Sequence, residues 1–219
     1  MRETLAKSRF LSQNLEPRFR VRMSMGTHYI TMVRHGQYDR MFGDEGDLNP
    51  TGQLQAVLTA DALRGQRFDA FLSSPVLRAR RTAERILTAL EGVTIRFDTR
   101  IEECVPSIPP AMAHWFGENR PHINGEHTVI CRRRVQDFYG EIFRGVSATA
   151  RDRHTLIVAH GNVIRFLLAH VLSPDQHAWT NMLVYHCSLS RVMIEANGDP
   201  MVIGVNDINH LAPEFRSEQ

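Results

Sequence analysis

Two apolar stretches of the chain end in the same pair of residues, a histidine followed by a glycine. In TMVRHG, Arg34 precedes His35, and LIVAHG ends in His160 and Gly161. Imidazole is a nucleophile and a general base near neutral pH, whereas arginine binds anions through its planar fork of donors. A lone histidine after a strand is usually structural. Two such endings with an adjacent arginine favour a site that binds an anion and acts on it.

A third stretch, FLSSPVLRARRTAE, places three arginines at the start of a helix. The N–H groups at a helix N-terminus attract anions, and an arginine added there suits phosphate. Arg78 and Arg81 are three residues apart and share a helix face, whereas Arg80 points elsewhere. We expect at least two of the three side chains to be solvated and one to bind phosphate.

The elements that must position these residues alternate between strands and helices. Apolar runs predict strands at about residues 29–34 and 69–73, in VTIRFD and in HTLIVAHG. Helices are predicted from Pro50, capped by Asn49, to Gly65, from Pro75 to about Leu90, over 128–144 and in NVIRFLLAHVL. This alternation predicts an α/β fold with a three-layer, doubly wound, mostly parallel sheet flanked by helices. Ligands bind such sheets beyond the carboxyl ends of strands, which is where both histidines fall.

Helical spacing also predicts which faces are buried. The expected buried residues are Leu54, Val57, Leu58 and Leu63 on the first helix, and Val135, Phe138 and Ile142 on the helix at 128–144.

Two segments are predicted to be special. Residues 104–127 contain four prolines, Gly117 and Gly125, and predict an irregular insertion that gates the site. Two apolar runs surround Asn197 and Gly198, which predicts a hairpin with a type I′ turn. Its outer strand is a candidate edge for a homodimer.

Composition excludes several function classes. The 219 residues include 26 basic and 24 acidic side chains, for a net charge of +2, so a nucleic-acid partner is not expected. No run approaches the roughly 20 apolar residues that span a bilayer. Cys104, Cys131 and Cys187 are too few and too scattered for a disulfide framework or a zinc cluster. We therefore expect a reducing, cytoplasmic setting.

Residues 1–27 form a basic arm, with six basic and two acidic residues, before a domain at 28–219. The arm lacks the apolar core of a secretory signal. It is arginine-rich and poor in acids, as a mitochondrial transit segment is. We favour a disordered arm, a docking helix or a translational start placed too early.

The ordered set VRHG, SSPVLRARRTAE, an Ile-x-Glu and VAHGNVIR resembles the histidine phosphatase superfamily, also called phosphoglycerate-mutase-like. The resemblance spans about residues 28–210. Within the superfamily, RHGQYD, HGNVIR and the HW pair after a proline-rich stretch are most similar to a mitochondrial branch of serine/threonine protein phosphatases. The resemblance implies the phosphoglycerate-mutase-like version of the predicted fold.

The resemblance also implies roles. His35 matches the nucleophile that forms a phosphohistidine, and His160 matches the second histidine of the pocket. Phosphate binding falls to Arg34 and Arg78, with contributions from Gly161, Asn162 and Gln37. For Asn162 a capping role is favoured, and Gln37 is more often merely polar in such a loop. The arrangement requires no metal and no cofactor.

A proton donor for the leaving group is implied in DTRIEEC. Glu103 fits the spacing better than Glu102, which is expected to be solvated. A partly desolvated carboxyl beside phosphate holds its proton more tightly, as a general acid must. Cys104, next to Glu103, is expected to be an inert thiol rather than an oxidation-sensitive one.

Three activities remain open on the same residues. A phosphatase is favoured over a phosphoglycerate mutase, because Met41 stands where mutases usually carry asparagine and the long basic substrate segment is absent. A non-catalytic phosphate binder is disfavoured because no expected catalytic residue is lost. The expected partner is a phosphorylated substrate, either a phosphoprotein or a small phosphate ester. The run Arg132-Arg133-Arg134 is expected to be mostly a solvated face.

Overall fold

The computed structural model describes residues 26–39, 46–120, 122–173, 175 and 177–218. Its strands are β1 (His28–Arg34), β2 (Ala70–Ser73), β3 (Ile95–Phe97), β4 (Arg153–Ala159), β5 (Leu189–Ile194) and β6 (Pro200–Asp207). Its α-helices are α1 (Pro50–Leu63), α2 (Leu77–Leu87), α3 (Ala113–Asn119), α4 (Gly125–Ile142) and α5 (Gly161–Leu172). Most of the basic arm, and residues 40–45 of the loop after β1, lie outside the described residues.

The strands form one mixed sheet in the order β3-β2-β4-β1-β5-β6. The four strands from β3 to β1 are parallel, whereas β5 and β6 run antiparallel to their neighbours. The predicted mostly parallel sheet is therefore confirmed. Because β1 and β4 are parallel neighbours, Arg34 pairs with Ala159, and the residues that follow both strands meet at one edge.

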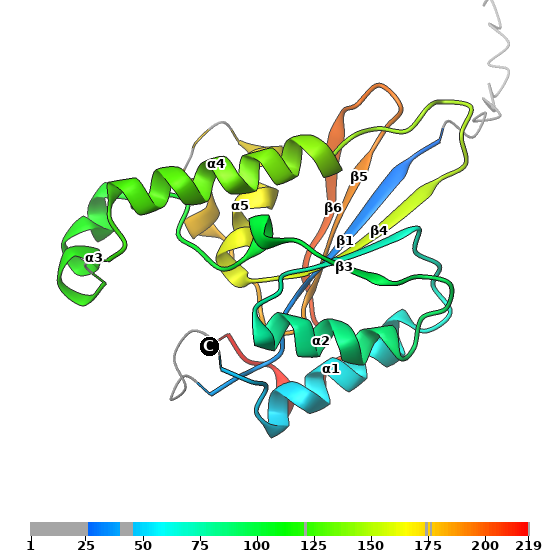
Figure 1. Ribbon diagram of the computed structural model, residues 1–219, viewed down its shortest axis with the longest axis horizontal. Coiled ribbons are helices and arrows are strands. Elements are labelled where there is room, and N and C mark those ends of the chain that lie inside the picture. Colours follow the sequence, from blue (N-terminus) through cyan, green and yellow to red (C-terminus); the bar gives the residue numbers. More distant parts are fainter. Residues whose placement is uncertain (1–25, 40–45, 121, 174, 176, 219) are drawn as a thin grey trace, which may run out of the picture.

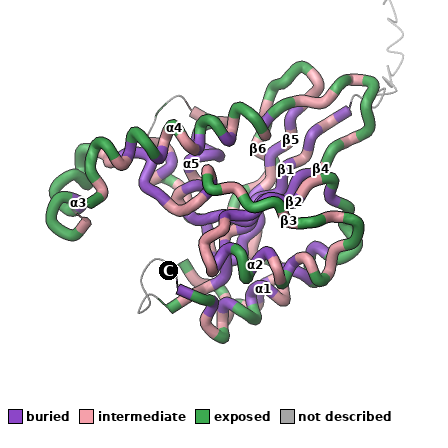
Figure 2. The backbone as a smooth tube through the Cα atoms, in the orientation of Figure 1, coloured by how far each residue is buried: buried purple, intermediate pink, exposed green. Residues whose placement is uncertain are grey.

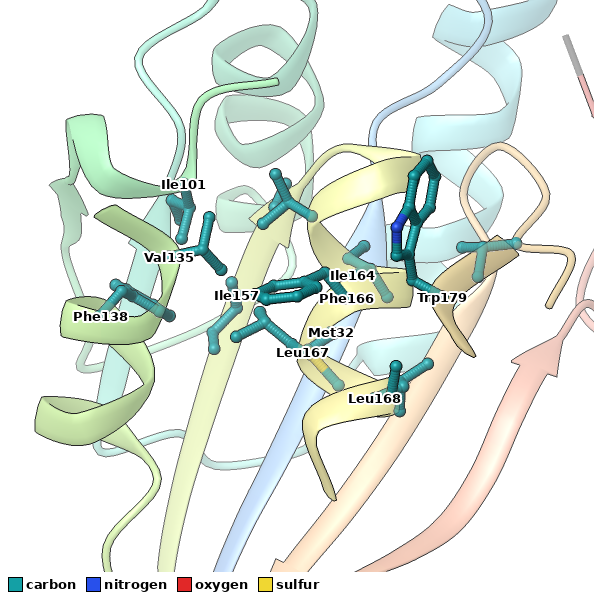
Figure 3. Close-up of a cluster of buried hydrophobic side chains, with 14 of the residues drawn as sticks. Met32, Ile101, Val135, Phe138, Ile157, Ile164, Phe166, Leu167, Leu168 and Trp179 are labelled. Atoms are coloured by element: carbon teal, nitrogen blue, oxygen red, sulfur yellow. The ribbon is translucent and has the colours of Figure 1, made fainter. Parts of the chain in front are cut away.

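Helices cover both faces of the sheet, with α1 and α2 on one side and α4 and α5 on the other (Figure 1). Alternate residues of β4 point to opposite faces, as the pleat requires. Leu156 and Val158 pack with the α1 and α2 side chains, whereas Ile157 packs into the cluster beneath α4 and α5. Figure 3 shows this second cluster, in which Phe138 and Phe166 approach Ile157 from the two helices.

Helix α1 begins as predicted but buries a different face. Asn49 is its N-cap, and the Asn49 side chain accepts a hydrogen bond from the Gly52 N–H, while Pro50 is the first helical residue. Of the expected apolar face only Leu63 is buried. Leu54 is 38% exposed, and the helix instead buries small and polar residues: Gly52, Gln55, Ala56, Thr59 and Ala60. At Gly52 a close approach of the loop after β1 leaves no room for a side chain.

The remaining helices match their predictions more closely. Helix α2 starts at Leu77 rather than Pro75, because Ser74 and Pro75 still belong to the turn after β2. In α4, Val135 and Phe138 are buried and Ile142 packs against the same cluster, as expected.

The hairpin between β5 and β6 is confirmed, but its turn is not type I′. That turn needs positive φ at both central residues, whereas Gly198 has φ of 92° and Asn197 is not among the positive-φ residues. The backbone bonds Gly198 N–H to Glu195 O and Glu195 N–H to Asp199 O close a longer loop. Strand β6 leaves one edge of the sheet unpaired within the described residues, and the homodimer stays a prediction.

The 104–127 insertion is more ordered than predicted. It contains a short 3₁₀ turn at Pro110–Met112, all of α3 and the first turns of α4. Figures 1 and 2 show α3 and the adjoining end of α4 projecting from the body, with largely exposed backbone. A disulfide joins Cys104 to Cys131, so the expectation of no disulfide and of a Cys104 thiol is wrong. It ties the start of the insertion to α4.

Within the described part of the chain, no helix has both the length and the apolar character needed to cross a bilayer.

Candidate active site

His35 follows β1 directly and is 2% exposed. Its Nδ1 lies 2.8 Å from the Gly36 carbonyl oxygen. A carbonyl can only accept, so Nδ1 carries the proton and Nε2 keeps its lone pair. The Nε N–H of Arg78 donates to that Nε2 at 3.1 Å, which fits the same tautomer. One ring nitrogen is thus fixed by the backbone and the other presents a lone pair.

The charge state of His35 follows from its surroundings. Burial lowers the pKa of His35 well below its usual value, and the charges of His160, Arg34, Arg78 and His186 lower it further. The imidazole is therefore neutral near pH 7, as a nitrogen nucleophile must be.

Arg78 occupies the first turn of α2 and is 2% exposed. Its guanidinium also lies over the Tyr38 ring, 4.5 Å from the centroid. Arg80 and Arg81 are exposed and pair with Glu84. One arginine of the three thus enters the site, as predicted, and two are solvated.

Arg34, the last residue of β1, is held by the C-terminal part of the chain. Its Nη1 donates to the carbonyl oxygens of Val184 and Glu218 at 2.6 and 2.7 Å. Its Nη2 lies 3.0 Å from His186 Nε2, and since the guanidinium can only donate, that nitrogen accepts. His186 then donates from Nδ1 to Ser217 Oγ at 2.9 Å. These bonds fix the position of the Arg34 charge.

His160 is the N-cap residue of α5 and is fully buried. Its Nε2 lies 2.8 Å from Ser74 Oγ, and among the described residues its Nδ1 has no hydrogen-bond partner. The rings of His35 and His160 are 5.1 Å apart between centroids. Burial and the charges of Arg78 and Arg34 lower the pKa of His160 well below its usual value. A buried nitrogen without a partner is uncommon, so His160 Nδ1 is a candidate contact for a ligand atom.

Gly161 and Asn162 begin α5. A Cβ on Gly161 would lie 3.3 Å from Arg34 Nε, so the glycine allows the backbone to approach that guanidinium. Asn162 does not cap the helix, contrary to the favoured prediction. The cap position belongs to His160, and the Asn162 side-chain oxygen accepts a hydrogen bond from Arg165 one turn later.

The two candidate acids are clearly distinguished by their surroundings. Glu102 lies 3.5 Å from Arg134 Nη1, and its carbonyl accepts from the same guanidinium. Glu103 accepts from the Cys104 N–H at 3.1 Å and forms no ion pair within the described residues. Burial raises the pKa of Glu103 despite the opposing charges of Arg78 and Arg34. The arrangement favours Glu103 as the acid that keeps a proton.

The backbone of Gln37 fixes the loop after β1. Its N–H donates to Gln55 Oε1 at 2.8 Å, and its carbonyl accepts from Asn49 N–H at 3.1 Å. The loop packs tightly on α1, because a Cβ on Gly52 would lie 1.9 Å from the Gln37 carbonyl oxygen. Gln37 is not among the residues that line the adjoining cavity.

A cavity of about 770 Å³ opens next to these residues. Tyr38, Arg78, Glu102, Glu103 and Asn162 line one part of it, and the insertion supplies much of the rest. Arg78 therefore connects the cavity with His35. No group of three or more potential metal-binding side chains occurs among the described residues.

Several residues of the site were not assigned a role from the sequence. Ser74 lies inside a quoted motif, but a serine in a turn gives no signal of its own. His186 lies before β5, so it lacks the His-Gly ending that identified the other two histidines. Tyr38 follows the RHG motif in a polar loop, and Arg165 is one polar residue of a predicted helix. Neither position carries a sequence signal for the site.

The sequence is similar to proteins of one known family. A model of the histidine phosphatase superfamily (branch 1) matches residues 30–207. The chain is 32% identical over 192 residues to the mitochondrial serine/threonine-protein phosphatase Pgam5 of Caenorhabditis elegans, covering 85% of this chain and 65% of the relative. The chain spans about two thirds of the length of the curated relatives it matches.

Solved structures share the fold. A mycobacterial glucosyl-3-phosphoglycerate phosphatase aligns with a TM-score of 0.65 at 22% identity, covering 83% of this chain and 99% of that one. A phosphoglycerate mutase from Plasmodium falciparum aligns with a TM-score of 0.58 at 22% identity, covering 86% of this chain and 96% of that one. A phosphatase and a mutase thus have this fold, and the likeness does not separate the two reactions.

These matches confirm the predicted family and fold class, and they correct the predicted location. The relatives from Caenorhabditis elegans, Drosophila virilis and Xenopus tropicalis are named as mitochondrial, so the cytoplasmic prediction is wrong. Near-balanced charge and the lack of an apolar signal do not distinguish the cytoplasm from the mitochondrion.

Proposed function

The chain belongs to the histidine phosphatase superfamily, and from this premise we propose that it hydrolyses phosphate monoesters through a phosphohistidine on His35. We propose phosphoserine and phosphothreonine proteins as its substrates, in keeping with the name of its curated relatives. The observation that carries the proposal is the tautomer of His35. Its Nδ1–H is bound to the Gly36 carbonyl, so a buried, unprotonated Nε2 faces Arg78.

In the first step the lone pair of His35 Nε2 forms a bond to phosphorus while the bond between phosphorus and the leaving oxygen breaks. Arg78 lies where an incoming phosphate must bind, and its donors turn from Nε2 to the phosphate oxygens. Arg34 adds fixed positive charge, and His160 adds a buried Nδ1 that has no partner among the described residues. Such preorganised donors supply most of the catalysis in phosphoryl transfer.

The leaving oxygen takes a proton from Glu103, whose raised pKa keeps the carboxyl protonated to higher pH than usual. In the second step a water attacks the phosphohistidine and gives its proton to the Glu103 carboxylate. The phosphorus–nitrogen bond breaks, His35 regains its lone pair, and inorganic phosphate leaves. Each group ends the cycle in its starting protonation state.

The first test replaces His35 with Ala and follows hydrolysis of p-nitrophenyl phosphate. Loss of the nucleophile should remove essentially all activity, because the proposed phosphorus–nitrogen bond forms at His35 Nε2. Wild-type protein quenched during turnover of a radiolabelled substrate should retain label on the protein, and the variant should not. Full activity in pure variant protein would rule out the nucleophile assignment.

A phosphoglycerate mutase or a small-metabolite phosphatase is the alternative. Met41, the position that disfavours a mutase, lies outside the described residues. Isomerisation of 3-phosphoglycerate with 2,3-bisphosphoglycerate present tests the mutase directly. We expect negligible isomerisation, and robust turnover would replace the phosphatase proposal.

A further inference from the structure

The 770 Å³ cavity has a second wall that the reaction at His35 does not use. It is formed by α3, the turn that follows it and the first turn of α4. The residues of this outer wall are Trp115, Phe116, Arg120, His122, Ile123 and His127. Three of them are aromatic or aliphatic, and the other three carry a guanidinium or an imidazole.

The donors of the outer wall are unpaired within the described part of the chain. No hydrogen bond or ion pair there engages the side chains of Arg120 and His122, and His127 Nε2 is shielded from solvent without a partner. Among the nearby acids, Glu118 lies 3.3 Å from His114 and Glu102 faces Arg134, and no ion pair within the described residues joins an acid to Arg120 or His122. The guanidinium of Arg120 and the imidazole of His122 are therefore available to a negative group of a ligand.

The electrostatics around His127 agree with this. Burial lowers the pKa of His127, and the charges of His122 and Arg134 lower it further, which indicates positive potential at the wall. An arginine next to imidazole donors suits a carboxylate or phosphate, because charge-assisted bonds are the stronger ones.

We propose that the outer wall binds a second negative group of the substrate, and that the preferred substrates are phosphoserine or phosphothreonine segments with acidic residues beside the phosphorylated one. This inference rests on the proposed function. The phosphate occupies the Arg78 end of the cavity, and the flanking carboxylate reaches Arg120 and His122. Trp115, which is 50% exposed, and Phe116 pack against the peptide between the two charges.

The form of the wall favours a peptide over a small ester. The volume of the cavity lies in the upper part of the range for ligand pockets, which is roughly 300–1,000 Å³. Residues of α3 line its outer side, and α3 projects from the body of the protein (Figure 2). An extended chain can enter the cavity and leave it along this helix. A small bisphosphate would leave the exposed face of the Trp115 ring in contact with solvent.

The test compares two phosphopeptides that differ only beside the phosphoserine, one with Asp and Glu and one with Asn and Gln. The quantity measured is the ratio of kcat/KM for the acidic peptide to that for the neutral one, so any general loss of activity cancels. Wild-type protein should give a ratio well above one. In Arg120→Gln with His122→Gln, the ratio should fall roughly fivefold, the effect of about 1 kcal/mol for a solvent-exposed ion pair.

Two further variants sharpen the test. Arg133→Gln removes an exposed arginine of α4 that does not line the cavity, and it should leave the ratio unchanged. Arg120→Glu should reverse the preference in favour of a peptide with Lys and Arg at the flanking positions. A merely structural role for Arg120 cannot produce such a reversal.

A ratio near one in wild-type protein, or a ratio that survives in the double variant, would overturn the inference. Selective turnover of a small bisphosphate with no turnover of either peptide would overturn the peptide assignment. Failure to hydrolyse even p-nitrophenyl phosphate is a different result, because it removes the proposed phosphatase activity itself.

Discussion

At the scale of the residue, Glu102 and Glu103 are neighbours in the chain and line the same cavity, yet they have different chemistry. Arg134 faces Glu102, contacting its carboxylate at 3.5 Å and donating to its backbone carbonyl. Among the described residues the hydrogen-bond partner of Glu103 is the Cys104 N–H, and burial raises the pKa of Glu103. Only Glu103 is thus suited to give a proton to a leaving alkoxide.

The role of Glu103 predicts a dependence on the leaving group. Glu103→Gln should lower kcat on a phosphoserine peptide by roughly 10²–10⁴-fold, the usual contribution of a general acid. The loss on p-nitrophenyl phosphate should be much smaller, because nitrophenolate leaves without a proton. Glu102→Gln is the matched control, and an equal loss on both substrates, or a larger loss from Glu102, would contradict the assignment.

The same assignment fixes the pH profile on the peptide. His35 must be unprotonated and Glu103 protonated at the start of the reaction. The pKa of His35 is lowered, so activity should begin to rise at a pH below the usual histidine pKa. The pKa of Glu103 is raised, so activity should fall again only at a pH above the usual carboxyl pKa. The limb on which the rate falls as pH rises should therefore disappear in Glu103→Gln.

The sequence predicts which residues lie at the ends of strands, but it does not predict most of their hydrogen-bond partners. His35, His160 and Arg78 stand in local patterns that mark the end of a strand or the start of a helix, so their placement follows from short stretches. His186 reaches Arg34 from a segment 152 residues away, and no local pattern encodes that distance. The wrong capping role of Asn162 has a different cause, because His160 takes the cap position and Arg165, one turn later, binds the Asn162 side chain.

At the scale of the element, the position of His35 depends on how closely its loop packs on α1. Gly36 and Gly52 face each other, and a Cβ on Gly36 would lie 2.6 Å from the Gly52 carbonyl oxygen. The glycine of the RHG motif is thus required by a backbone contact. The expected burial of Leu54 failed for the same reason: α1 turns its small residues, not its leucines, toward the loop.

Replacing a helical glycine with Ala should lower stability where the glycine makes this contact and raise it where the glycine does not. Gly52→Ala should destabilise the protein by about 1–3 kcal/mol, because the new methyl overlaps the Gln37 backbone, and it should lower kcat by displacing His35. Gly140→Ala in α4 meets nothing within 4 Å and should stabilise by about 0.5–1 kcal/mol through helix propensity. Urea midpoints measure both, and a neutral Gly52→Ala would contradict the contact.

At the scale of the whole molecule, the order of strands and the pairing of cysteines could not be predicted. Each strand is visible as an apolar run, but the sheet order β3-β2-β4-β1-β5-β6 depends on crossovers that no single run contains. Cys104 and Cys131 are separated by 27 residues and meet only because the insertion folds back on α4. Their disulfide fixes the segment that carries Glu103 relative to that helix.

His28 links distant parts of the fold at the other end of the sheet and is 1% exposed. Its Nδ1 lies 2.8 Å from the Arg144 carbonyl oxygen, which can only accept, so that nitrogen carries the proton. Its Nε2 then accepts from the Thr155 hydroxyl at 2.8 Å. Protonation of Nε2 would break this bond, and burial lowers the pKa of His28.

The lowered pKa predicts how stability changes with pH. Because the pKa in the folded protein lies below the unfolded value near 6.5, the unfolded chain binds more protons as pH falls through that value, and stability decreases. One such histidine contributes a slope of up to about 1.4 kcal/mol per pH unit. His28→Gln keeps a donor and an acceptor but does not titrate, so its free energy of unfolding between pH 6.5 and 5 should fall less steeply than that of wild type. Effects of His35, His160 and Glu103 are common to both proteins and cancel in the difference, so parallel curves would show that His28 is not held neutral by the fold.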